Sequence, residues 1–113
     1  MSAAIYSARK GLRVAIVAER VGGQVKETVG IENLISVPET TGSELADNLK
    51  THLLRYPVDL LEHRKIEKVE ILGKQKLVTT SVGEKFLAPA LIIATGASWR
   101  RLNVPGEIGR AHV

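Results

Sequence analysis

Two short apolar runs stand out in the hydrophobic pattern of this chain. Residues 13–18 read Arg-Val-Ala-Ile-Val-Ala, and residues 90–95 read Ala-Leu-Ile-Ile-Ala-Thr. A continuous apolar run of this length is typical of a strand that is buried on both faces, as in a parallel sheet. We therefore predict strands at residues 14–17 and 90–94. A third short strand is predicted at Val58-Asp59-Leu60-Leu61.

Two other segments have the pattern of helices. Residues 3–10 carry several alanines that would form a small-residue face, and Gly11 is well placed to end that helix. A second helix would begin after Thr41, which with Glu44 fits a capping box, and would stop before Pro57. Its apolar face would be formed by Leu45, Leu49 and Leu53.

The second half of the chain adds a different pattern. Residues 65–72, 76–82 and 85–88 predict an antiparallel meander, with turn signals at Gly73-Lys74 and Gly83. The full order is helix, strand, helix, strand, meander, strand. Alternation of this kind predicts an α/β fold, in which helices cover a parallel sheet and the meander is inserted before the last strand.

Composition narrows the possible functions. A length of 113 residues allows one domain. The net charge is only +4, basic residues are scattered and aromatic residues make up 4%, which argues against nucleic-acid binding. No apolar run reaches the roughly 18 residues of a membrane span, and the first residues lack the pattern of a signal peptide. We therefore expect no membrane association and a cytoplasmic location.

The chain lacks the residues of several common reaction centres. It has no cysteine, which excludes disulfides and thiolate metal sites within these residues. His52 and His63 have no second ligand at metal spacing, so we expect no metal site. No Ser-His-acid set is present either, so hydrolytic catalysis is not favoured.

A glycine-bearing turn follows each of the two main apolar runs. Gly22-Gly23-Gln24 comes after the first run, and Ala94-Thr95-Gly96 closes the second. Without a Cβ, glycine lets the backbone approach a phosphate or a planar ring closely. Both turns would lie at the carboxyl ends of parallel strands, which predicts a nucleotide cofactor there.

Each polar candidate near these turns also has a simpler interpretation. Glu19 stands where an acid could bind ribose hydroxyls, but spacing alone favours a surface acid paired with Arg20 or Lys26. Asn33 could fix a heterocycle, or it could be a turn residue that caps its own backbone. The long irregular segment at residues 19–38 holds both, and long loops in compact domains are often functional.

Several of these segments together resemble one protein family, the thioredoxin reductase-like flavoproteins. Ala4-Ile5-Tyr6-Ser7-Ala8-Arg9-Lys10-Gly11 is similar to the helix after the phosphate-binding glycines of that family. Glu19-Arg20-Val21-Gly22-Gly23-Gln24-Val25 and Gly30-Ile31-Glu32-Asn33 are similar to its flavin loop. Ala94-Thr95-Gly96-Ala97-Ser98-Trp99, followed by Asn103-Val104-Pro105-Gly106, completes a resemblance that covers residues 3–107.

The resemblance implies an FAD-dependent pyridine-nucleotide:disulfide oxidoreductase. In such enzymes NADH reduces FAD, the flavin reduces a Cys-x-x-Cys dithiol, and electrons pass to a thioredoxin-like domain and a peroxiredoxin partner. A homodimer is implied for the full-length protein. The residues implied to hold the cofactor are Glu19 at the ribose, Gly22, Gly23, Gln24 and Asn33 at the flavin, Ile66 near the adenine, and Ala94, Thr95 and Gly96 closing over it.

The resemblance also implies parts that these residues lack. A first strand and a Gly-x-Gly-x-x-Gly loop would stand before Ser2, and that strand would lie between residues 13–17 and 90–94. The NADH domain and the Cys-x-x-Cys would follow the last residue. We therefore expect residues 1–107 to be a partial Rossmann-like FAD-binding domain and 108–113 to be a non-native tail.

Such a partial domain, on its own, would bind FAD weakly or not at all and would be inactive. The main expectation is thus a section of an oxidoreductase. Two alternatives stay open: a small non-catalytic αβ module that binds nucleotides, and a truncated product without function.

Overall fold

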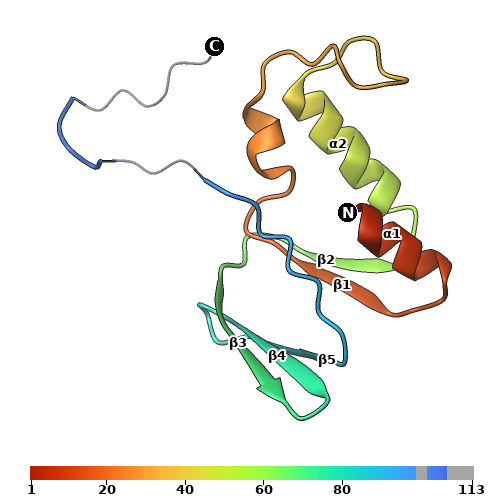
Figure 1. The fold of residues 1–113 in the computed structure, drawn as a ribbon, viewed down its shortest axis with the longest axis vertical. Helices are drawn as coiled ribbons and strands as arrows, with labels where there is room; N and C mark the ends of the chain where they lie inside the picture. Colours follow the sequence, from red (N-terminus) through yellow and green to blue (C-terminus); the bar gives the residue numbers. More distant parts are fainter. Residues whose placement is uncertain (99–101, 107–113) are drawn as a thin grey trace.

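The fold consists of a parallel pair of strands that is covered by helices, followed by a separate antiparallel meander (Figure 1). The computed structural model describes residues 1–98 and 102–106. Trp99 and the expected tail at residues 108–113 lie outside the described residues. The elements, in chain order, are α1 Ser2–Arg9, β1 Val14–Val17, the 3-10 helix η1 Gly23–Glu27, α2 Gly42–Leu53, β2 Val58–Leu61, β3 Ile66–Leu72, β4 Gln75–Thr80 and β5 Lys85–Ala88.

The first helix ends as the sequence predicts. Gly11 has φ of 82°, and its N–H donates to the Ala8 carbonyl at 2.9 Å. The next amide, that of Leu12, donates to the Ser7 carbonyl at 3.2 Å. These two bonds form a Schellman motif, which satisfies the last carbonyls of the helix and needs a residue in the left-handed region. The motif explains why glycine stands at this position.

The second helix confirms half of the capping box. Its N-cap Thr41 accepts a hydrogen bond from the Glu44 amide at 3.1 Å. The Glu44 carboxylate instead accepts a hydrogen bond from the Thr40 hydroxyl at 3.2 Å, so it is not used on the Thr41 amide. The helix ends at Leu53, ahead of Pro57.

Strands β1 and β2 pair in parallel, with Val14 opposite Val58 and Val17 opposite Leu61. The helix α1 packs on both strands and on α2. A small core joins the helices to the sheet: Ala4, Leu53 and Val58 are buried, and Leu53 has no exposed surface. Burial of these apolar side chains is the main force that holds the helices on the strands.

The meander β3–β4–β5 is antiparallel, as predicted. Its first turn contains Gly73 at φ of 63°, and its second contains Gly83 at φ of 87°. Val78 and Thr80, both on the central strand β4, are its most buried residues. The Thr80 hydroxyl accepts a hydrogen bond from the Glu84 amide at 3.2 Å, which closes the second turn.

The predicted strand at residues 90–94 is wrong for this structure. These residues form no strand, and Leu91, Ile92 and Ile93 are 38%, 70% and 71% exposed. A strand is completed by hydrogen bonds to a neighbour. Among the described residues, β1 pairs only with β2 and no strand runs beside 90–94. The apolar pattern is therefore present without the partner that a strand needs.

Candidate cofactor site

The carboxyl ends of β1 and β2 form the edge where the first candidate lies. The ladder continues past β1, because the Ala18 amide donates to the Leu61 carbonyl at 2.9 Å and the Arg64 amide donates to the Ala18 carbonyl at 3.0 Å. Glu19 follows at once and is exposed. Its carboxylate makes no hydrogen bond or ion pair within the described part of the chain, so it is free to accept hydrogen bonds from a ligand.

The interpretation of Glu19 as the partner of Arg20 is wrong. Arg20 forms its ion pair with Glu27, at 3.0 Å between Nη1 and Oε1. Glu27 is the last residue of η1, a helix that the sequence pattern did not predict. The fold of η1 therefore brings a different acid to Arg20 and leaves Glu19 exposed at the end of β1.

The two glycines of the Gly22-Gly23-Gln24 turn have different surroundings. Both have positive φ, 93° at Gly22 and 52° at Gly23. A Cβ at Gly22 would lie 2.8 Å from the Cβ of Ala46 on α2, whereas a Cβ at Gly23 would meet nothing within 4 Å. Gly22 is thus needed for close packing against the helix. Gly23 has open space beside it, where a planar ligand could approach the backbone.

Charged side chains connect this edge to α2 and to the meander. Lys50 on α2 donates a hydrogen bond to Glu62, just past β2, at 2.8 Å. That hydrogen bond, together with the positive charges of Lys50, His63 and Lys26, lowers the pKa of Glu62. Arg64 donates to the Glu62 carbonyl at 2.7 Å and pairs with Glu84 of the meander at 3.1 Å.

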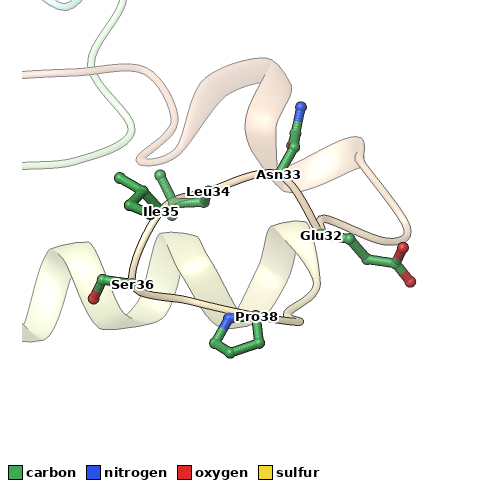
Figure 2. A pocket seen from close by; sticks show the side chains of 6 residues that line it. All are labelled: Glu32, Asn33, Leu34, Ile35, Ser36 and Pro38. Carbon is green, nitrogen blue, oxygen red and sulfur yellow. The ribbon is translucent and has the colours of Figure 1, made fainter.

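Asn33 lies in a different place. It lines an open hollow of about 380 Å³ that is formed by a single loop, whose lining residues are Glu32, Asn33, Leu34, Ile35, Ser36 and Pro38. In Figure 2, Asn33 and Glu32 point away from Leu34 and Ile35. None of the other candidate residues lines this hollow. Within this hollow, Asn33 is therefore not joined to the Gly22-Gly23-Gln24 turn.

The loop around this hollow is ordered by its own backbone. The Val37 amide donates to the Leu34 carbonyl at 3.0 Å, and Ser36 in that turn has φ of 78°. Ile31 and Thr40 exchange two hydrogen bonds, at 2.8 and 2.9 Å, at the base of the loop. The Asn33 side chain makes no hydrogen bond in the described structure, so the interpretation of Asn33 as a cap of its own backbone does not hold.

The remaining candidates lie at the start of the meander and at the end of the apolar run that follows it. Ile66 is the first residue of β3, half-buried, and pairs with Thr80. Ala94, Thr95 and Gly96 are exposed. Gly96 has φ of 67°, and a Cβ there would meet nothing within 4 Å. Gly96 therefore resembles Gly23: each is a left-handed glycine with an open face.

Sequence reasoning missed Gly42 and Ala46, which contact the glycine turn from α2. A Cβ at Gly42 would overlap the Val25 carbonyl oxygen and lie 2.5 Å from that of Thr28. Small residues four apart lie on one face of a helix, so the pair could have been predicted as a close-packing face. In the described structure, no group of three His, Cys, Asp or Glu side chains could hold a metal. No described helix is long and apolar enough to cross a membrane.

Comparison with known proteins decides the family. The family described as "Pyridine nucleotide-disulphide oxidoreductase" matches residues 1–113, which is the whole chain. The chain belongs to this family. Over 106 residues it is 51% identical to the F subunit of alkyl hydroperoxide reductase from Staphylococcus aureus strain NCTC 8325 / PS 47 and 50% identical to the Staphylococcus epidermidis protein. The match covers 94% of this chain and 21% of each relative.

Solved structures confirm the fold of this chain. Thioredoxin reductase from Streptococcus pyogenes MGAS5005 superimposes with a TM-score of 0.83 at 38% identity, over 93% of this chain and 34% of that one. Lactococcus lactis thioredoxin reductase gives 0.84 at 31% identity, with the same coverage. The expected α/β fold and the resemblance to thioredoxin reductase-like flavoproteins are thereby confirmed. The chain spans about a fifth of the length of its curated relatives (21%) and about a third of these structures (34%).

Proposed function

We propose that residues 1–107 are a partial FAD-binding domain of an oxidoreductase that passes electrons from NADH through FAD to a dithiol and then to a peroxiredoxin. The family match and the relatives named as the F subunit of alkyl hydroperoxide reductase support this proposal. By the same similarity we propose that the whole protein is a homodimer that acts in the cytoplasm, where NADH is available.

The residues of the glycine turns have the properties that FAD requires. The exposed Glu19 carboxylate just past β1 would accept hydrogen bonds from ribose hydroxyls. Gly23 and Gly96, each with an open face, would let the flavin ring approach the backbone, and Gln24 would offer both a donor and an acceptor. Thr95 and Ala94 would close over the cofactor, with Ile66 as an apolar contact for the adenine.

Gly22 and Asn33 have different parts in this proposal. Gly22 would set the position of its turn through its contact with Ala46. Asn33 would reach the flavin only if its loop lies beside the bound cofactor.

When bound, FAD would take two electrons from NADH and deliver them to a disulfide, so that NADH, a proton and a disulfide become NAD⁺ and a dithiol. The chain has no cysteine, so other residues must provide the disulfide. The residues of this chain would bind and orient the cofactor and exclude water from it. The observation that carries the proposal is the pair of left-handed glycine turns, one after β1 and one after the apolar run at residues 90–94.

The test compares two proteins. One is the product of the complete open reading frame that contains this sequence, and the other is the 113-residue chain alone. We expect the former to purify yellow with one FAD per chain and to oxidise NADH when a peroxiredoxin and a hydroperoxide are supplied. Absence of flavin from that product would contradict the proposal.

The 113-residue chain is expected to bind FAD weakly or not at all and to oxidise no NADH. If it carries stoichiometric flavin, the expectation that the chain alone binds FAD weakly is wrong. If the product of the complete open reading frame binds flavin but oxidises no NADH, the alternative of a non-catalytic binding module replaces the proposal. A variant of the complete product with Glu19→Gln keeps the shape of the side chain and removes its charge. We expect it to bind FAD more weakly, because a neutral amide accepts hydrogen bonds from ribose less strongly than a carboxylate.

A further inference from the structure

The Gly22-Gly23-Gln24 turn is tied to the first residue of α2 by a series of backbone hydrogen bonds. The Val25 amide donates to the Gly22 carbonyl at 3.1 Å, and the Thr28 amide donates to the Val25 carbonyl at 3.1 Å. The Gly42 amide then donates to the Thr28 carbonyl at 2.8 Å. Val25 and Thr28 each donate one of these bonds and accept the next. The bonds therefore connect the turn to the start of the helix through η1, so a shift of the turn would disturb the helix start.

Two small residues on α2 allow this contact. Gly42, the first residue of the helix, is buried, and a Cβ there would overlap the Val25 oxygen. One helical turn later, Ala46 is 2% exposed and approaches Gly22 so closely that a Cβ on Gly22 would lie 2.8 Å away. The helix surface under the turn therefore has no space for even one added methyl group.

The start of α2 is itself held firmly. Thr41 caps it through the Glu44 amide, and the Glu44 carboxylate accepts from the Thr40 hydroxyl. Thr40 is buried and exchanges two backbone hydrogen bonds with Ile31. Figure 1 shows η1 beside the first turns of α2. These hydrogen bonds hold the start of the helix, and the turn packs against it through η1.

We infer that Gly42 and Ala46 are positioning residues for the flavin. They set the place of Gly23 and Gln24 relative to the end of β1, although neither contributes a side chain to the cofactor. This inference rests on the proposed function, because the position of the turn affects function only if the turn binds the flavin. Glycine at position 42 is unexpected by helix propensity, since alanine is favoured over glycine in helices. The contact with η1 explains it.

The test substitutes Gly42→Ala in the product of the complete open reading frame, with Ser43→Thr as the matched control. Ser43 is the next residue of the helix and is exposed, so each variant adds one methyl group, but only Gly42→Ala adds it against η1. We expect Gly42→Ala to weaken FAD binding by about tenfold or more, since small misplacements of binding groups have large effects. The visible absorption maxima of the bound flavin should shift, and Ser43→Thr should match the parent protein.

A second pair of variants distinguishes a displaced turn from a protein that fails to fold. Ala46→Leu adds volume under Gly22, whereas Thr51→Leu adds it at an exposed position of the same helix. We expect only Ala46→Leu to weaken FAD binding and to shift the flavin spectrum, while both proteins keep the parent's far-ultraviolet circular dichroism.

The outcomes separate the two proposals. If the parent protein carries no flavin, the proposed function and this inference both fail. If the parent carries flavin but Gly42→Ala and Ala46→Leu bind FAD with the parent's affinity and spectrum, the inference alone is overturned. It is also overturned if affinity and spectrum change equally in the control variants.

Discussion

The two apolar runs of this chain have nearly the same pattern and different structures. Residues 14–17 form β1, paired with β2 along its full length, and Val14, Ile16 and Val17 are half-buried. Residues 90–94 form no strand, and Ile92 and Ile93 are 70% and 71% exposed. The difference is the neighbour: β1 has β2 and α1 against it, whereas no described strand or helix completes the second run.

An apolar run indicates that a segment needs to be buried. It does not indicate which other residues bury it. An unpaired apolar run leaves backbone donors and acceptors available for another strand and favours association.

The largest effect that we predict is a difference in the free energy of unfolding between substitutions in these two regions. Leu53→Ala removes a side chain with no exposed surface from the core under α1 and β2, and should lower the free energy of unfolding by about 2–5 kcal/mol. Ile92→Ala, in the exposed run, should change it by less than about 0.5 kcal/mol. Urea unfolding of the 113-residue chain measures both. Equal effects would mean that residues 90–94 are as well packed as β1.

The helix that covers β1 provides a second test of intermediate size. Gly11→Ala forces a Cβ into the left-handed region at φ of 82°, which should cost about 1–2 kcal/mol of stability. Gly30→Ala is the control, because nothing restricts a Cβ there. Thermal unfolding followed by circular dichroism compares the two. Equal stability of both variants would show that the Schellman motif does not hold α1 on the strands.

The smallest expected effect concerns the ion pair at the end of β2. The Lys50 hydrogen bond lowers the pKa of Glu62 in the folded chain, so the pair stabilises the fold above the usual glutamate pKa. That contribution is lost as the pH falls through the lowered pKa in the folded state. Glu62→Gln should therefore flatten the acid limb of the stability curve. Glu67→Gln, at an exposed residue without an ion pair in the described structure, should leave it unchanged, and identical acid limbs would exclude a role for the pair.

The sequence predicted those features that depend on neighbours in the chain. The Schellman glycine at Gly11, the N-cap at Thr41 and the strand β1 all follow from local pattern, and the structure has each of them. The features that were missed depend on contacts between distant residues. They include the 3-10 helix η1, which brings Glu27 to Arg20, and the close approach of Gly22 to Ala46.

The candidate site also combines features that follow from local sequence with features that depend on distant contacts. The sequence predicted where Glu19, Gly23 and Gly96 stand along the chain, at the ends of apolar runs. It did not predict that Asn33 would line a separate hollow, nor that Gly22 would be required by a helix rather than by a ligand. Both depend on how the segment at residues 19–38 packs, which no local pattern records.

We propose that the turns after β1 and after residues 90–94 hold a single flavin between them. Amide hydrogen exchange of the complete open reading frame product, with and without FAD, tests this directly. We predict slower exchange with FAD at residues 19–24 and at 94–96 together, with no change at the β4–β5 turn around Gly83. Slower exchange at only one of the two turns, or at neither, would contradict the claim.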